Sequence, residues 1–90
     1  MVDYSRLPAH MQDVARRYIE DGIEPGSFLR AVASNDLMGA FDRADNTNRA
    51  AMYAWVTFFY NEAPRGSHGS PEAYDYWIAI GGLNGRNSND

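Results

Sequence analysis

Hydrophobic residues recur along this chain with the spacing of helices, and the alternation that is typical of strands is scarce. One helical face consists of Met11, Val14, Ala15 and Tyr18. Their i, i+3, i+4, i+7 spacing places these apolar side chains on one side of a helix. Pro8 suits a first helical turn and Gly22 a left-handed C-terminal cap, so the pattern predicts a helix over residues 8–21.

The next segment, residues 25–44, contains two groups of helically spaced apolar residues: Phe28, Leu29 and Val32, followed by Leu37, Ala40 and Phe41. Ser34 and Asn35 separate the two groups, and Asp36 is suited to cap a helix formed by the second. The segment is therefore one bent helix or two short ones, and we expect two, each with its apolar group facing inward.

The stretch from Ala50 to Tyr60 is apolar on almost every side of a helix. Residues suited to cap it are Asp45, Asn46 and Thr47, and Pro64 stops it, which predicts a helix over about 47–62. A helix without a polar face is normally enclosed by others. We expect it either to be the centre of the bundle or to use one face for the core and another for a partner subunit. The composition VTFFY also suits a strand, but its lead-in NRAAMYAW favours a helix.

The last predicted helix has clear boundaries. Ser70 is suited to be its N-cap, Pro71 its first residue, and the pair Gly81-Gly82 its end. The pattern as a whole predicts an all-α fold, a compact bundle of four to five short helices around the apolar helix at about 47–62. We expect one helical domain over residues 1–83 and a flexible polar tail over 84–90.

Composition sets limits on this picture. The 90 residues are 44% hydrophobic, which is enough apolar material for one small core. A core of this size leaves a thin stability margin, which is compatible with a homo-oligomer. The net charge of −4 argues against binding to duplex nucleic acid, which requires a basic surface.

The sequence also indicates a soluble, cytoplasmic protein. It has no cysteine, and its longest apolar run is about half of the roughly 20 residues that cross a bilayer, so we expect no membrane partner. No secretory signal is visible at the N-terminus.

All eight cationic residues are arginine. GC-rich codon usage accounts for this bias most simply, yet the arginines are the best available ligands for an anion.

The loop NEAPRGSHGS, residues 61–70, is the first candidate site. Its glycines, hydroxyls and arginine lead directly into a helix N-terminus, which is a plausible anion-binding nest. The candidate ligand-binding residues are Asn61, Arg65, Ser67, His68 and Ser70. The alternative is an ordinary helix–helix connection, since the same residue types suit loops, and this alternative is the simpler one.

A second polar group, FDRADNTNR, adds Arg43 and Arg49 as possible ligands for the same anion. Capping and arginine–aspartate pairs explain this group more simply. Its acidic residues lack the spacing of a calcium loop, and the two histidines lack zinc-ligand spacing, so we expect no metal site and no cofactor.

Catalysis has little support in the sequence. A serine, His68 and Glu62 lie too close along the chain for a serine–histidine–acid triad, and no nucleophile elbow is present. We therefore predict no catalytic residue.

Three tyrosines lie off the main helix faces and are candidates for exposed positions: Tyr53, Tyr60 and Tyr76. Exposed tyrosines are favoured at protein interfaces.

The strings GIEPGSFLRAVASNDLMGAFDRADNTNR and FFYNEAPRGSHGS resemble a group of small hypothetical proteins of tailed phages and prophages. The resemblance covers about residues 7–80 and carries no assigned activity. It implies an accessory protein that acts in the host bacterial cytoplasm, with counter-defence as the expected role. We therefore expect a non-enzymatic protein that binds a small anionic ligand, such as a nucleotide second messenger that it sequesters. The alternatives are an inhibitor or regulator of a host protein and, less favoured, a small hydrolase using His68.

Overall fold

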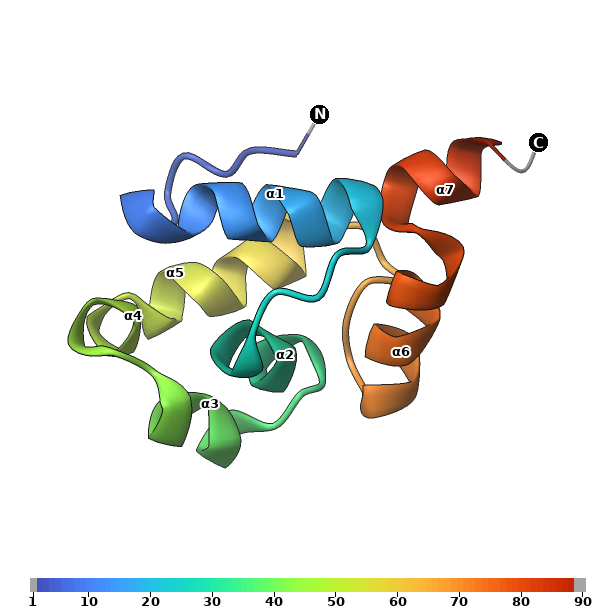
Figure 1. Cartoon of the computed structure of the whole chain (residues 1–90). Coiled ribbons are helices and arrows are strands. Elements are labelled where there is room, and N and C mark those ends of the chain that lie inside the picture. The colour runs from blue at the N-terminus through green and yellow to red at the C-terminus, as the bar shows by residue number, and fades with distance from the viewer. Residues whose placement is uncertain (1, 89–90) are drawn as a thin grey trace.

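Seven short α-helices build the described part of the chain, residues 2–88 of a computed structural model, and no strand occurs there. Two further turns accompany them, one 3-10 turn (η1) and one π-helical turn (η2). In chain order the elements are η1 (Ala9–Met11), α1 (Gln12–Asp21), α2 (Ser27–Ala33), α3 (Leu37–Arg43), α4 (Asn46–Ala50), α5 (Met52–Thr57), η2 (Phe58–Glu62), α6 (Pro71–Ile80) and α7 (Gly82–Ser88). Figure 1 shows their arrangement. The predicted all-α fold is confirmed.

The first predicted helix is present as η1 followed by α1. Gly22 ends α1 in the left-handed conformation, with φ 67°, as its position in the sequence predicts. The inward side of α1 contributes Tyr18 and Ile19, both fully buried, to the core. This helix is therefore held to the bundle by large side chains near its C-terminal end.

Residues 25–44 form two helices, α2 and α3, as predicted. The Asp36 side chain caps α3 by accepting a hydrogen bond from the backbone N–H of Gly39 at 3.0 Å. The expected inward edge of α3 is wrong in part: Ala40 is buried, but Leu37 is 61% exposed and Phe41 42% exposed. A helix of seven residues buries only a narrow strip, and the small side chain of Ala40 occupies it.

The segment predicted as one helix is divided into α4, α5 and η2. The Asp45 side chain caps α4 by accepting from the N–H of Asn48, and Ala51 leaves helical geometry between α4 and α5. The side chains directed into the core are Met52, Trp55, Phe58 and Phe59. On the other side, Tyr53 is 81% exposed and Tyr60 86% exposed. The segment is thus helical and not a strand, but it is not enclosed on all sides.

The two tryptophans are fully buried, and each indole N–H has a partner. Trp55 Nε1 donates to Asn48 Oδ1 at 3.2 Å. Trp77 Nε1 is shared between the carbonyl oxygens of Tyr18 at 3.0 Å and Ile19 at 3.1 Å. These bonds join α5 to α4 and α6 to α1, so they fix the helices as well as satisfying buried polar groups.

The C-terminal part begins as predicted, with Ser70 Oγ accepting from the N–H of Ala73 at 3.0 Å at the start of α6. Gly81 ends α6 with φ 79°. The chain then turns into α7, which packs beside the C-terminal end of α1 (Figure 1). The predicted polar tail is therefore replaced by helix over residues 84–88, and its last two residues lie outside the described part. Among the described helices, none is long and apolar enough to span a bilayer.

Candidate functional site

The loop between η2 and α6 is anchored from inside the protein. Ser67 is fully buried, and its Oγ donates to the carbonyl oxygen of Pro64 at 2.6 Å. The Tyr18 hydroxyl, on α1, donates to the carbonyl oxygen of Ser67 at 2.6 Å. Burial raises the pKa of Tyr18, so this hydroxyl keeps its proton and remains a donor.

Several groups expected to form an anion-binding nest in this loop already have partners within the chain. The Ser67 N–H donates to the Pro64 carbonyl oxygen at 3.1 Å, and the Gly69 N–H to the Ala33 carbonyl oxygen at 2.8 Å. The Ser70 hydroxyl caps α6. These groups hold the loop in place, which is the role of an ordinary helix–helix connection.

His68 lies half-buried against the ring of Phe59, with ring centres 5.2 Å apart. Burial lowers the pKa of His68, so the neutral imidazole is favoured. Its Nδ1 is 3.1 Å from Ser67 Oγ. Since the single hydroxyl hydrogen of Ser67 makes the shorter bond to Pro64, we assign Nδ1 as the donor to Ser67. In this arrangement His68 does not act as a base toward the serine.

The other predicted ligands do not meet at the loop. Arg65 is exposed, and Asn61 lines a separate hollow. The charged residues of that hollow are Glu20, Glu62 and Arg86, so its formal charge of −1 disfavours an anion. Arg49 lies on α4, where its Nη1 is 3.4 Å from Asn46 Oδ1.

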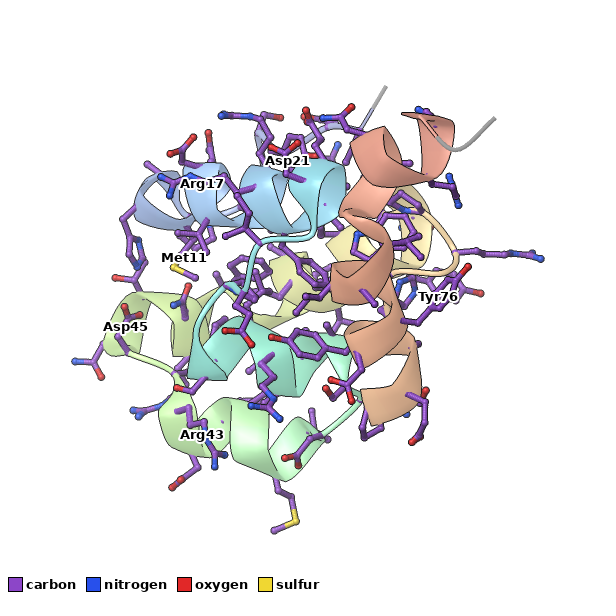
Figure 2. All side chains as sticks on the ribbon, turned by 45° about the vertical axis from the view of Figure 1, so that its right-hand side comes forward. Met11, Arg17, Asp21, Arg43, Asp45 and Tyr76 are labelled. Carbon is purple, nitrogen blue, oxygen red and sulfur yellow. The ribbon has the colours of Figure 1, made fainter. Side chains whose placement is uncertain are left out.

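The polar group before α5 contains the predicted cap, but the expected arginine–aspartate pairs are not among the ion pairs of the described residues. The carboxylate of Asp45 caps Asn48 at 2.7 Å and lies 3.0 Å from His10 Nε2. Figure 2 shows Asp45 at this corner and Arg43 on the neighbouring helix α3. These contacts tie α4 to the N-terminal turn η1.

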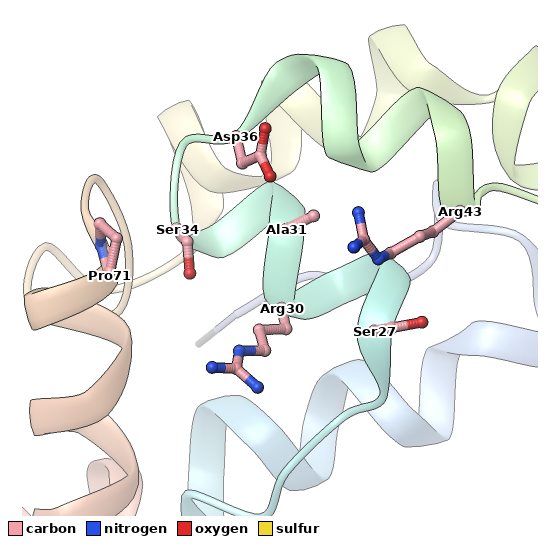
Figure 3. Close-up of a pocket in the computed structure, with 7 residues that line it drawn as sticks. All are labelled: Ser27, Arg30, Ala31, Ser34, Asp36, Arg43 and Pro71. Carbon is pink, nitrogen blue, oxygen red and sulfur yellow. The ribbon is translucent and has the colours of Figure 1, made fainter.

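Arg43 belongs to a different cleft, which lies between α2, α3 and the start of α6. The cleft has a volume of about 420 Å³, and its lining residues are Ser27, Arg30, Ala31, Ser34, Asp36, Arg43 and Pro71. Figure 3 shows Arg30 extending from α2 toward α6, and Arg43 reaching from α3 over α2. The turn at Asp36 produces this arrangement, because it folds α3 back along α2.

Within residues 2–88, no carboxylate lies within ion-pair distance of either arginine of the cleft. The guanidinium of Arg30 lies over the ring of Tyr74, 5.6 Å from its centre, and Arg43 Nη1 donates to the carbonyl oxygen of Gly39 at 3.3 Å. Within residues 2–88, the ion pairs involve Arg16, Arg17 and His10 on the cationic side. Both guanidinium groups in the cleft therefore retain N–H donors for a ligand.

The cleft carries positive charge on an acidic protein. Its two arginines and one aspartate leave a formal charge of +1, whereas the whole chain carries −4. Asp36 turns Oδ1 to the first turn of α3, where it accepts from the N–H of Gly39. The hydroxyls of Ser27 and Ser34 and the N-terminal end of α6 at Pro71 complete the lining. This arrangement suits an anionic group.

Sequence reasoning named Arg43, but not Arg30, among the possible anion ligands. Arg30 stands inside the apolar string FLRAV, which indicates only a helix with a buried face. The signal that was available is the turn predicted at Ser34–Asp36, since two helices that fold back on each other bring their arginines to one side.

The described residues contain no group of three or more His, Asp or Glu side chains arranged to hold a metal ion. No protein-family model, curated protein or solved structure matches this chain, so neither a family nor an activity is assigned to it by comparison.

Proposed function

We propose that this protein is a non-enzymatic binding module that captures a small anionic ligand in the cleft of Arg30 and Arg43. One observation carries the proposal: one cleft of a protein whose net charge is −4 is lined by two arginines that form no ion pair with any described carboxylate. Unpaired guanidinium groups gathered in a hollow are costly in a surface that serves only solubility, because like charges repel.

The chemistry of the lining matches phosphate or carboxylate. A guanidinium group binds either anion through two parallel hydrogen bonds, and the hydroxyls of Ser27 and Ser34 supply further donors. The volume of about 420 Å³ lies within the range of roughly 300–1,000 Å³ typical of small-molecule sites. A ligand with two anionic groups, or with one such group and a polar body, fits these donors best.

A phosphate-bearing ligand agrees with the resemblance to phage proteins. In an infected cell, a nucleotide second messenger is an anion of suitable size, and its capture by an abundant small protein would serve counter-defence in the host cytoplasm. This proposal keeps Arg43 from the residues predicted from sequence. It replaces the loop of Arg65 and His68 with the cleft, because the polar groups of Ser67, Gly69 and Ser70 in the loop are engaged within the chain.

The experiment is isothermal titration of the purified protein with inorganic phosphate, pyrophosphate, mononucleotides and cyclic dinucleotides. Arg30→Gln and Arg43→Gln each remove one guanidinium group of the cleft while keeping a polar side chain. A charge-assisted hydrogen bond contributes about 1.5–3 kcal/mol, so each variant should weaken binding roughly 10- to 100-fold. Arg49→Gln is the matched control, since it removes an arginine outside the cleft.

Two results would contradict the proposal. If Arg65→Gln abolishes binding and Arg30→Gln does not, the ligand site is the loop. If no anion of the panel binds at about 1 mM, the cleft is not a site for small phosphates.

A further inference from the structure

A second surface feature lies between α2, α3 and α5, where Val32, Leu37 and Val56 come together. It consists of two adjoining hollows of about 220 Å³ and 70 Å³, which share Val32, Asn35 and Val56 in their walls. We call the two hollows together the groove. Phe59, Tyr60 and His68 line its larger end, and Leu37, Ala40 and Met52 line its smaller end. The groove is thus a largely apolar depression on the protein surface.

Large, exposed apolar residues stand on the helices that border the groove. Leu37, Val56 and Tyr60 line it, and Phe41 and Tyr53 lie one helical turn away on α3 and α5; together we call these five residues the apolar face. Tyr53, Val56 and Tyr60 follow i, i+3, i+7 spacing along α5 and η2, so they form one stripe. Leu37 and Phe41, four residues apart on α3, form the opposite stripe. Monomeric proteins rarely leave a continuous apolar surface of this kind uncovered.

We propose that a second copy of this chain covers the apolar face and forms a two-fold symmetric dimer. The first argument is area. An exposed tyrosine side chain offers on the order of 150–250 Å², so the five residues together present roughly 600 Å². A standard interface buries about 800 Å² on each partner, and in homodimers about 65% of it is apolar. The apolar face therefore supplies the apolar area that such a dimer requires.

The second argument is shape. A two-fold interface must be self-complementary, because the same patch serves both subunits. The apolar face has a projection and a hollow side by side: Tyr60 is 86% exposed, and it stands at the rim of the larger hollow. A two-fold axis near Val56 places an exposed tyrosine of each protomer against the hollow of the other.

The third argument is charge. Two copies with a charge of −4 each repel one another, so they associate most readily through a surface with few acidic groups. Among the residues that line the groove, Asp36 is the one acidic side chain and His68 the one basic side chain, and the apolar face itself contains no acidic or basic residue.

The test is sedimentation equilibrium of the full chain over a range of protein concentrations. A dimer doubles the mass of the 10.1 kDa chain. Tyr60→Arg places a charge in the interface, and we expect it to weaken dimerisation at least tenfold. Tyr76→Arg is the matched control, because Tyr76 is also an exposed tyrosine but projects from α6 on a different side from Arg43 and α3 (Figure 2). Circular dichroism checks that both variants fold.

If Tyr60→Arg fails to fold, Leu37→Arg tests the opposite stripe in the same way. A wild-type chain that keeps the monomer mass up to about 1 mM overturns the proposal, and the apolar face then serves a different protein. A dimer that survives Tyr60→Arg and Leu37→Arg also overturns it, since the interface then lies elsewhere. Arg30 and Arg43 line a separate cleft, so neither result decides whether the anion binds.

Discussion

Gly22 and Gly82 bring the backbones of two chain segments into direct contact at the junction of α1, α6 and α7. A β carbon on Gly22 would lie 2.8 Å from the backbone nitrogen of Gly82, and one on Gly82 would lie 2.6 Å from that of Gly22. Both residues have positive φ angles, 67° and 66°. Each of the two positions therefore requires glycine for two reasons: the backbone conformation has a positive φ, and the two backbones approach too closely for a side chain.

This contact predicts that Gly82→Ala is strongly destabilising. The new methyl group would meet the Gly22 nitrogen and the Ile19 carbonyl oxygen, so the start of α7 must move away from α1. We expect a loss of about 2–4 kcal/mol in the free energy of unfolding, measured by urea denaturation. Gly26→Ala is a stringent control, because Gly26 has φ 92° but no atom within 4 Å of an added β carbon. An equal loss in both variants would mean that backbone strain alone is responsible.

The buried pair of Asn48 and Trp55 gives a second prediction. Asn48→Ala removes the acceptor of the Trp55 indole N–H, which has no access to water. A buried donor without a partner costs about 1–3 kcal/mol, and we expect a loss of that size in chemical denaturation. Asn46→Ala changes an exposed asparagine of the same helix and should cost less than about 0.5 kcal/mol. Comparable losses would show that the side chain of Asn48 acts through helix α4 rather than through the indole.

Four helix boundaries could be predicted because their causes are local, whereas the break at Ala51 and helix α7 were not predicted. Asp36, Asp45 and Ser70 each cap the helix that follows within three residues, and Gly22 ends α1 by its own conformation. The orientation of α3 could not be predicted in this way. Its apolar residues have correct helical spacing, but which of them face the core depends on how closely α2 approaches.

The candidate site was also harder to predict, because it too depends on contacts between residues that are far apart in the sequence. Glycine, serine and arginine have the same chemistry in a structural loop as in an anion site, and the difference is whether their polar groups already have partners. In the loop those partners are Tyr18 and Ala33, which are far away in sequence. The exposure of Tyr53 and Tyr60, in contrast, followed from their spacing alone, and the structure confirms it.

The environment of His68 predicts a loss of stability in mild acid. Burial places its pKa in the folded protein below the ordinary 6.5, so the unfolded chain takes up the proton first. The stabilisation is complete above about pH 6.5 and is lost as the pH falls toward the lower pKa of the folded state. Denaturation curves at about pH 8 and about pH 5 measure this difference, and His68→Gln should reduce it.

The acidic residues act in a separate pH range. Hydrogen bonds lower the pKa of Asp13, with Arg17 as the main donor, and that of Asp45, with the Asn48 backbone as the main donor, below 3.8. Their contributions to stability are lost only at lower pH. His10→Gln is the control for the removal of an imidazole. If the pH dependence is unchanged in His68→Gln but absent in His10→Gln, then His10 causes the loss of stability and the prediction for His68 is wrong.

The anchor between Tyr18 and Ser67 predicts that the loop of residues 61–70 is a structural connection. Tyr18→Phe removes the hydroxyl that donates to the Ser67 carbonyl oxygen, while the ring keeps its stacked contact with Tyr74. We expect a loss of about 1–2 kcal/mol in the free energy of unfolding and faster amide hydrogen exchange at Ser67 and Gly69. Tyr76→Phe, at an exposed position, should change neither quantity. Because the Arg30 and Arg43 cleft makes no use of this bond, anion affinity should stay within about twofold of the wild type in Tyr18→Phe. A variant that loses anion binding together with the anchor would instead place the ligand at the loop.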